Sequence, residues 1–220
     1  MALSLSKQKR TETIMAEGLR FGPIDKLASH LCVDMQGLFR GDSPWAMPWF
    51  DRVLPNVHLL IERDPFATIF TRFLPAKNLT EAGGAWLRYY QKWEGLLLDH
   101  VEPSKVDIVP ELKRYAPPAI VVDKWVYSPW FGSTLPTLLR TRHIRTVLVS
   151  GGETDVCVLS TVLGAVDFGF RVIVVSDAVC SSSDSAHDAM QLFYNQRLSQ
   201  QVETASTEEV LDNWVVLQRL

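Results

Sequence analysis

The chain has 220 residues, of which 47% are hydrophobic and 21% are charged, and its formal net charge is −3 at pH 7. This composition is typical of one globular domain with a large core. The small negative charge gives no reason to expect a nucleic acid or an anionic membrane as a partner. No apolar run has the length of a membrane span or of a signal peptide core, and three cysteines without paired spacing favour a reducing, cytoplasmic location.

Strands and helices are predicted to alternate along the chain. Residues 1–26 are polar and mixed, and we expect an N-terminal arm that is loose or lies on a neighbouring subunit, followed by one domain over residues 27–220. Short apolar runs predict strands at residues 28–33, 67–73, 119–124, 147–149 and 171–176. Apolar residues at helical spacing and N-cap residues predict helices at residues 50–62, 85–98, 133–139, 156–166, 183–198 and 207–214.

The predicted strands are apolar on both faces, so helices should cover both sides of a mostly parallel sheet. The expected fold is therefore a three-layer α/β/α, doubly wound α/β domain. Asp34, Lys124 and Cys157 each fall at or just beyond the carboxyl end of a predicted strand. In such a sheet these ends meet at one edge, where ligands bind, and we expect the three side chains to converge there.

Cys157 has the strongest local signal of the three. A buried strand leads to Gly151 and Gly152, and Thr154 is then a good N-cap for a helix that carries Cys157 in its first turn. The free N–H groups and dipole at a helix start favour the thiolate, the reactive form of cysteine. A lone cysteine in an apolar segment is more often a small buried hydrophobe, and we interpret Cys32 and Cys180 in that way.

The three residues together supply the groups needed for nucleophilic acyl transfer. Lys124 would favour the thiolate of Cys157, and Asp34 could accept its proton and return it to a departing amine. Free N–H groups around Glu153 and Cys157 could hold a tetrahedral oxyanion. Taken singly, Asp34 could cap a turn and Lys124 could be a surface charge, so their coincidence carries the prediction.

These residues resemble the isochorismatase-like cysteine hydrolases, a family that includes nicotinamidases, N-carbamoylsarcosine and ureidoacrylate amidohydrolases, biuret hydrolases and isochorismatases. The resemblance covers roughly residues 26–207 and rests on Asp34-Met35-Gln36, on Lys124 with Tyr127-Ser128 and Phe131, on Gly151-Gly152-Glu153-Thr154-Asp155-Val156-Cys157-Val158, and on Val174-Val175-Ser176-Asp177-Ala178. It implies an isochorismatase-like fold, a catalytic triad of Asp34, Lys124 and Cys157, and a homo-oligomer, a dimer or a tetramer. It also implies a cis peptide between Gly152 and Glu153.

The sequence departs from the family pattern at two places. Gly37 stands where many members have asparagine, which would alter the pocket wall. Nicotinamidases carry a histidine-containing metal set near the second strand, and residues 73–80 contain no histidine. We therefore expect no metal or other cofactor. Asp51 and His58 are seven apart on a predicted helix, a spacing that favours a solvated face over a ligand pair.

Five residues are candidates for binding the substrate: Gln36, Phe39, Trp45, Trp130 and Glu153. The tryptophans, with Trp49, suggest an aromatic-lined pocket, although each of them could equally belong to the core or to a subunit contact. Glu153 could contact the substrate or point away from it. A second aromatic cluster at residues 86–93 favours packing over binding.

The sequence thus predicts an amidohydrolase that cleaves a small non-peptide amide or carbamoyl compound through a thioester on Cys157. An isochorismatase-type ether hydrolase is the alternative within the family, and the cysteine disfavours it. A non-catalytic nucleotide- or partner-binding module is a further alternative. The G-x-G-x-x-G spacing of dinucleotide-binding folds fails here, because Glu153 stands at its third position.

Overall fold

The computed structural model describes residues 18–217. Within that part of the chain, six strands form one sheet in the order β3-β2-β1-β4-β5-β6, and every neighbouring pair is parallel. The strands are β1 (Ala28–Val33), β2 (Thr68–Phe73), β3 (Ile120–Lys124), β4 (Thr146–Gly152), β5 (Arg171–Cys180) and β6 (Val202–Ala205). The strand order reverses between β1 and β4, and that switch point is where doubly wound sheets place their ligands.

The connections between the strands contain helices of several kinds. The α-helices are α1 (Phe50–Arg63), α2 (Ala85–Lys92), α3 (Pro103–Val106), α4 (Pro110–Lys113), α5 (Leu135–Thr141), α6 (Leu159–Asp167), α7 (Asp184–Leu192) and α8 (Thr207–Asn213). Short 3₁₀ turns occupy η1 (Gly37–Phe39) and η2 (Glu94–Leu96), and π-helical turns occupy η3 (Thr154–Val158) and η4 (Phe193–Arg197).

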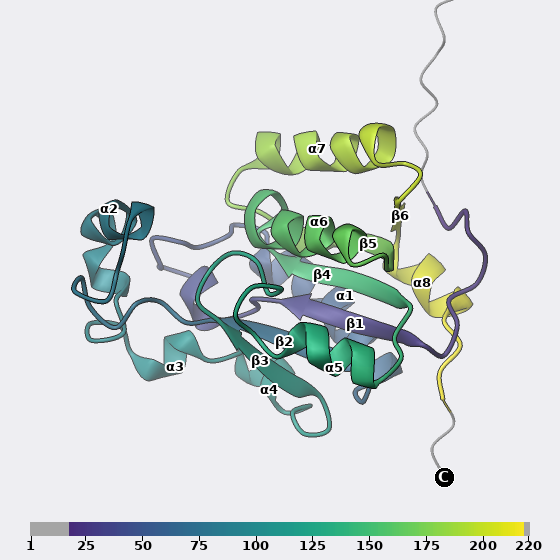
Figure 1. The fold of residues 1–220 in the computed structure, drawn as a ribbon, viewed down its shortest axis with the longest axis horizontal. Coiled ribbons are helices and arrows are strands. Elements are labelled where there is room, and N and C mark those ends of the chain that lie inside the picture. The colour runs from purple at the N-terminus through teal and green to yellow at the C-terminus, as the bar shows by residue number, and fades with distance from the viewer. Residues whose placement is uncertain (1–17, 218–220) are drawn as a thin grey trace, which may run out of the picture.

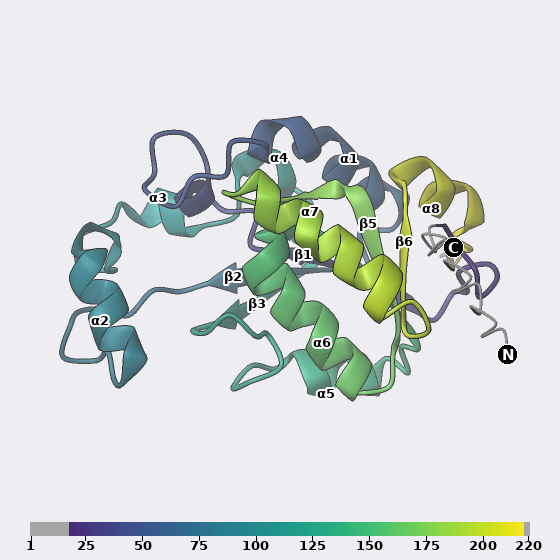
Figure 2. The same ribbon diagram turned by 90° about the horizontal axis from the view of Figure 1, so that it is seen from above.

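The sheet is covered on both faces, which confirms the predicted three-layer fold. Figure 2 shows α1 and α8 along one face and α5 and α6 along the other. The alternating side chains of each strand divide accordingly: Cys32 packs in the core under α1, and its neighbours Leu31 and Val33 pack in the core under α5 and α6. Figure 1 shows the α2 segment projecting beyond the carboxyl edge of this sheet.

Most predicted elements are present, with shifted ends. The long predicted helices at residues 85–98 and 183–198 are each interrupted, the first by η2 and the second by η4. The prediction missed β6, whose sequence Val-Glu-Thr-Ala lacks an apolar run. Glu203 nevertheless lies fully buried in this strand, because its carboxylate pairs with Arg171 at 2.7 Å.

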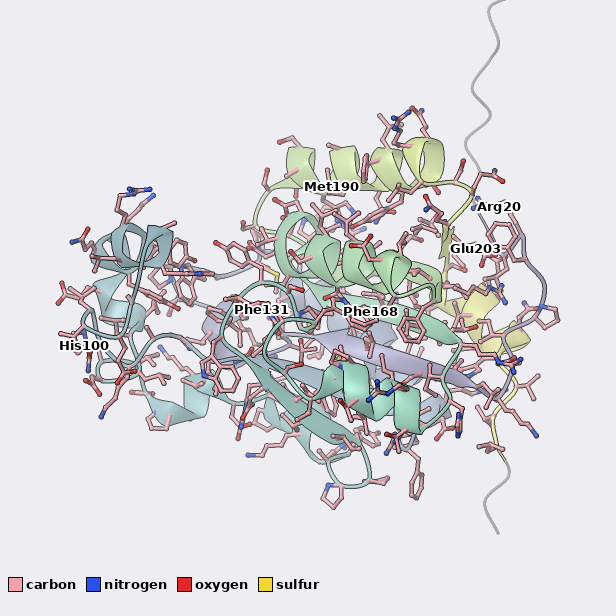
Figure 3. All side chains as sticks on the ribbon, viewed as in Figure 1. Arg20, His100, Phe131, Phe168, Met190 and Glu203 are labelled. Carbon is pink, nitrogen blue, oxygen red and sulfur yellow. The ribbon has the colours of Figure 1, made fainter. Side chains whose placement is uncertain are left out.

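The described end of the N-terminal arm packs on its own domain. The backbone N–H of Arg20 donates to Glu203 at 2.5 Å, and Figure 3 shows Arg20 beside Glu203 at the β6 edge. Ile24 is buried and forms a β-bridge with Trp214. Residues 18–26 therefore complete the fold, and the rest of the predicted arm lies outside the described residues.

We find no helix within residues 18–217 that is long and apolar enough to cross a membrane.

Candidate active site

Asp34 follows β1 directly and has an unusual backbone conformation. Its φ of 51° lies in the left-handed region, which Asp tolerates better than most residues. The Thr71 hydroxyl donates to Asp34 Oδ1 at 2.6 Å, and the Asp34 N–H donates to the Thr71 carbonyl at 3.2 Å. The side chain is therefore fixed at the end of β1, with its second carboxylate oxygen left for another partner.

The end of β4 approaches β1 too closely for any residue except glycine. Gly151 has a φ of 102°, and a Cβ placed on it would lie 2.1 Å from the Val33 carbonyl oxygen. The next peptide, between Gly152 and Glu153, is cis, at the position that the family resemblance implies. This turn leads into η3 and places Cys157 at the switch point beside Asp34.

The three predicted catalytic side chains meet at this edge of the sheet. Lys124 Nζ lies 2.7 Å from Asp34 Oδ2 and 3.4 Å from Cys157 Sγ. The ammonium also donates to the backbone carbonyls of Val126 and Tyr127, at 3.2 and 3.1 Å. The side chains of Lys124 and Asp34 are only 0% and 1% exposed, so this ion pair lies inside the protein.

Burial has the largest effect on the pKa of the Cys157 thiol and acts against one expectation. Burial raises the pKa of Cys157 above its ordinary value; Lys124 lowers that pKa and Asp34 raises it again. Although burial alone lowers the pKa of Lys124, Asp34 and Cys157 raise that pKa above its ordinary value. Burial and Asp34 therefore oppose the thiolate that the sequence predicts at neutral pH, and Lys124 favours it.

The local helix start also differs from the prediction. Glu153, and not Thr154, is the N-cap residue, and its side chain makes no capping hydrogen bond. Thr154 is buried, and its hydroxyl shares a 2.9 Å hydrogen bond with His187 Nδ1. Cys157 lies in the π-helical turn that precedes α6.

Cys157 opens onto a cavity of about 270 Å³ and is 7% exposed. The cavity lies between the carboxyl edge of the sheet and the segment that carries α2. Its walls are mostly aromatic, and the lining residues are Phe39, Pro44, Trp45, Phe73, Tyr89, Trp93, Tyr127, Glu153, Val156, Cys157 and Ser182.

Three of the five predicted substrate-binding residues line this cavity: Phe39, Trp45 and Glu153. Gln36 does not line it. Its fully buried amide donates to the carbonyls of Phe73 and Val106 and accepts the Phe73 N–H at 2.7 Å, so it joins β1 to its neighbours.

The prediction that Trp130 binds the substrate places this residue wrongly. Its indole N–H donates to the Thr161 carbonyl at 2.8 Å, and its ring stacks on Phe168 and Phe170. A Cβ on Gly164 would lie 2.1 Å from this ring, which shows how closely α6 packs against it. Trp130 therefore anchors the loop after β3 to α6 and does not line the cavity.

Sequence reasoning missed several cavity residues. Tyr89 and Trp93 line the cavity, whereas the sequence pattern at residues 86–93 favours packing within the protein over ligand binding. The available signal was their i, i+4 spacing, which places both side chains on one helix face. Trp86 of the same cluster does pack, stacking on Tyr90 at 5.9 Å.

Two residues that line the cavity carry polar groups with few hydrogen-bond partners among the described residues. Trp45 Nε1 is buried and has no hydrogen-bond partner within residues 18–217. Glu153 accepts a long 3.3 Å hydrogen bond from the Ser182 N–H. Burial raises the pKa of its carboxyl, and a hydrogen bond from the Ser182 side chain lowers it. Gly37, in contrast, lies against α3, where a Cβ would come within 2.9 Å of Lys105 Cα, so it is not part of the wall.

No group of three or more His, Cys, Asp or Glu residues within residues 18–217 is placed to hold a metal ion. Asp51 pairs with Arg40 at 2.7 Å, and His58 lies near Glu62, 3.7 Å away. Asp51 is exposed to solvent, as predicted, whereas His58 is only partly exposed and shares a 2.8 Å hydrogen bond with the Tyr115 hydroxyl.

Comparison with known proteins identifies the family of this chain. A family model described as the isochorismatase domain matches residues 28–206. The chain belongs to the isochorismatase family. Nicotinamidase 3 of Arabidopsis thaliana is 29% identical over 170 residues, which cover 76% of this chain and 80% of that protein. Maleamate amidohydrolase of Pseudomonas putida is 28% identical over 107 residues, which cover 49% of this chain and about half, 48%, of that protein.

Solved structures of the family share the fold. A cysteine hydrolase from Pseudomonas syringae superimposes with a TM-score of 0.75 at 21% identity, covering 90% of this chain and 98% of that chain. The family and its named relatives agree with the expected enzyme class, a hydrolase of carbon–nitrogen bonds other than peptide bonds.

Proposed function

We propose that this protein is a cysteine-dependent amidohydrolase that cleaves a C–N bond of a small non-peptide amide or carbamoyl compound. One observation carries the proposal: the Cys157 thiol faces a cavity and also lies 3.4 Å from the ammonium of a buried Lys124–Asp34 ion pair. A nucleophile, a proton acceptor and a fixed positive charge thus meet at one wall of a substrate-sized space.

The first step forms a thioester. The Cys157 sulfur attacks the amide carbonyl while its proton passes to Asp34, so the thiolate forms only as the bond to carbon forms. Lys124 stabilises the negative charge that develops on sulfur. The backbone N–H groups of Glu153 and Cys157 are the proposed donors to the oxyanion. Asp34 then gives its proton to the leaving amine, and the C–N bond breaks.

The second step returns the enzyme. A water molecule occupies the space left by the amine, Asp34 accepts one of its protons, and hydroxide attacks the thioester carbonyl. The C–S bond breaks, the acid product leaves, and the proton on Asp34 returns to sulfur. This cycle needs no resting thiolate, because each proton that leaves Cys157 or water has the same acceptor, Asp34.

An ether hydrolase of the isochorismatase type is the second candidate in this family. Attack by a thiol has no role in simple protonation and hydration of a vinyl ether, whereas the buried contact between Cys157 and Lys124 has a direct role in acyl transfer. The contact therefore favours the amide. We further propose, from the family resemblance, a cytoplasmic homo-oligomer.

Ammonia release tests the function. Purified protein is assayed with a panel of small primary amides, ureides and carbamoyl acids, with Cys157→Ala as the control. The proposal predicts ammonia from at least one amide with the wild type and none above background with the variant. Turnover of an enol ether and of no amide would instead identify the ether hydrolase.

A further inference from the structure

The charge of the cavity wall is negative. Among the described residues that line the cavity, none is Lys, Arg or His, whereas Glu153 contributes a carboxylate beside Cys157. Lys124 lies behind the wall, fully buried, and its charge is balanced by Asp34 at 2.7 Å. A substrate that enters this cavity therefore meets a negative group and no free positive one.

The rest of the wall is built from aromatic rings that hold one another in place. Trp45 stacks on Phe39 at 6.1 Å and on Tyr89 at 5.6 Å between ring centroids, and it meets Phe73 edge-on at 6.1 Å. Tyr127 approaches the same cluster through Trp86, at 4.9 Å. Ring faces attract cations, and an enclosed set of rings is the usual protein site for an ammonium group.

The carboxylate belongs to the same enclosure as the rings. The cavity is lined by Glu153 together with Tyr89, Trp93 and Tyr127. Burial, Tyr127 and Tyr90 raise the pKa of the Tyr89 phenol, and the Glu153 charge raises it further. Among the described residues Glu153 accepts hydrogen bonds from Ser182 alone, a long one from its N–H and one from its side chain. A carboxylate has about four acceptor sites, so capacity for a ligand remains.

We propose that the site selects amides that carry a cationic nitrogen, which the Glu153 carboxylate and the aromatic wall hold while Cys157 faces the amide carbonyl. This inference rests on the proposed amidase function and adds the charge of the substrate. The carboxylate of an anionic amide would lie near Glu153, which has the same charge. It would lose its hydration without gaining a partner of opposite charge.

Binding probes that cannot be hydrolysed test the inference separately from catalysis. Choline, 3,3-dimethylbutan-1-ol and 3,3-dimethylbutanoate share a branched head or its isostere and include a cation, a neutral molecule and an anion. Isothermal titration of the wild type should give the affinity order cation, neutral, anion, with choline at least about tenfold tighter than the neutral alcohol. Equal affinities of the wild type for the three probes, or a preference for the anion, would by themselves overturn the inference.

Variants assign the preference to the carboxylate. Glu153→Gln keeps the shape of the side chain and removes its charge, and it should reduce the choline preference about tenfold. Glu94→Gln is the matched control, because Glu94 is exposed and follows the wall residue Trp93 without lining the cavity. A preference that survives Glu153→Gln unchanged would contradict the inference.

Two amides then connect binding to turnover. Trimethylglycinamide and 3,3-dimethylbutanamide differ by one charge at the same position, and the ratio of their kcat/KM values should fall about tenfold from wild type to Glu153→Gln. Comparing the ratio between the proteins removes the intrinsic reactivity of each amide. Amide turnover without charge preference would overturn this inference and leave the amidase standing. A choline preference that depends on Glu153, without turnover of any amide, would support a cation site at Glu153 and overturn the amidase, and with it the selection of amides.

Discussion

The Lys124 ammonium lies 2.7 Å from the Asp34 carboxylate, and both side chains are almost completely enclosed by protein. The lysine charge is therefore balanced before any substrate arrives. Cys157, 3.4 Å from the same ammonium, meets a pair with no net charge in place of a free cation. The ammonium therefore opposes the effect of burial on the pKa of the thiol less than a free cation would.

Alkylation of Cys157 should respond in opposite directions to the loss of each partner. Lys124→Met removes the charge that lowers the pKa of Cys157, so the pH midpoint for reaction with iodoacetamide should rise. Asp34→Asn removes a charge that raises the same pKa, so the midpoint should fall. In the wild type we expect a midpoint above about 8.5, the ordinary value for cysteine. Peptide mass mapping across pH gives the three midpoints.

Cys32 and Cys180 are internal controls for that measurement. Both are fully buried away from the cavity and should stay unlabelled while the protein is folded. Each single variant leaves one buried charge unpaired, at a cost of about 3–5 kcal/mol in folding free energy, so circular dichroism must first show a folded protein. Midpoints that shift in the same direction for both variants would refute the opposed roles.

Trp45→Phe should weaken substrate binding more than it slows chemistry. Trp45 lines the cavity, and its enclosed Nε1 donor has no partner among the described residues, so a substrate oxygen that reaches it would accept its hydrogen bond. Phenylalanine keeps a ring and loses the N–H, so KM should rise about fivefold, the equivalent of about 1 kcal/mol, with kcat nearly unchanged. Trp49→Phe, outside the cavity lining, is the control; equal effects of both changes would argue against a donor role.

Two glycines separate backbone strain from steric clash. Gly151 and Gly169 both have positive φ, 102° and 81°, but only at Gly151 would a Cβ strike the backbone, 2.1 Å from Val33 O. Gly169→Ala should cost about 1–2 kcal/mol of unfolding free energy. Gly151→Ala should cost more than about 4 kcal/mol or prevent folding. Urea unfolding of both variants measures the difference, and similar costs would contradict the close approach of β4 to β1.

His30 should make the fold sensitive to acid. Burial lowers the pKa of His30 to about 3, and its ring nitrogens bond Ser150 at 2.7 Å and Thr68 at 3.4 Å. The pKa of His30 in the folded protein is below its unfolded value of 6.5, so the neutral, buried ring stabilises the fold fully above pH 6.5. This stabilisation is lost as the pH falls towards 3. Between pH 7.5 and pH 5 the loss should reach about 2 kcal/mol.

His30→Gln isolates that contribution from the other acid-sensitive groups. Glutamine stays neutral, so the stability difference between wild type and variant should shrink by about 2 kcal/mol from pH 7.5 to pH 5 in urea titrations. A difference that stays constant with pH would show that His30 does not change protonation on unfolding.

The sequence predicted the sheet and the triad because their signals are local and strong. Apolar runs locate β1 and β4, and the polar residues that follow them, Asp34 and Cys157, are brought together by parallel topology alone. The geometry among Asp34, Lys124 and Cys157 follows from three strand ends on one edge, which a pattern of alternating elements already implies.

What failed depends on contacts between distant segments. The charge state of Cys157 depends on burial and on the Lys124–Asp34 pair, neither of which can be measured in a linear sequence. Trp130 and Tyr89 are similar signals in the sequence, yet packing directs Trp130 to α6 and Tyr89 to the cavity. The sequence pattern does not predict β6, because the burial of Glu203 in this strand depends on its pair with the distant Arg171.

A mass spectrum of the acid-quenched enzyme tests the central claim most directly. The protein is mixed in single turnover with the amide that releases ammonia fastest, quenched in acid within milliseconds to seconds, and digested. The account predicts that the mass of the acyl group appears on the Cys157 peptide in the wild type, decays with the release of acid, and is absent from Cys157→Ala, which should lose turnover at least about a thousandfold. Wild-type ammonia release by Cys157→Ala, or an acyl group on any other residue, would contradict the account.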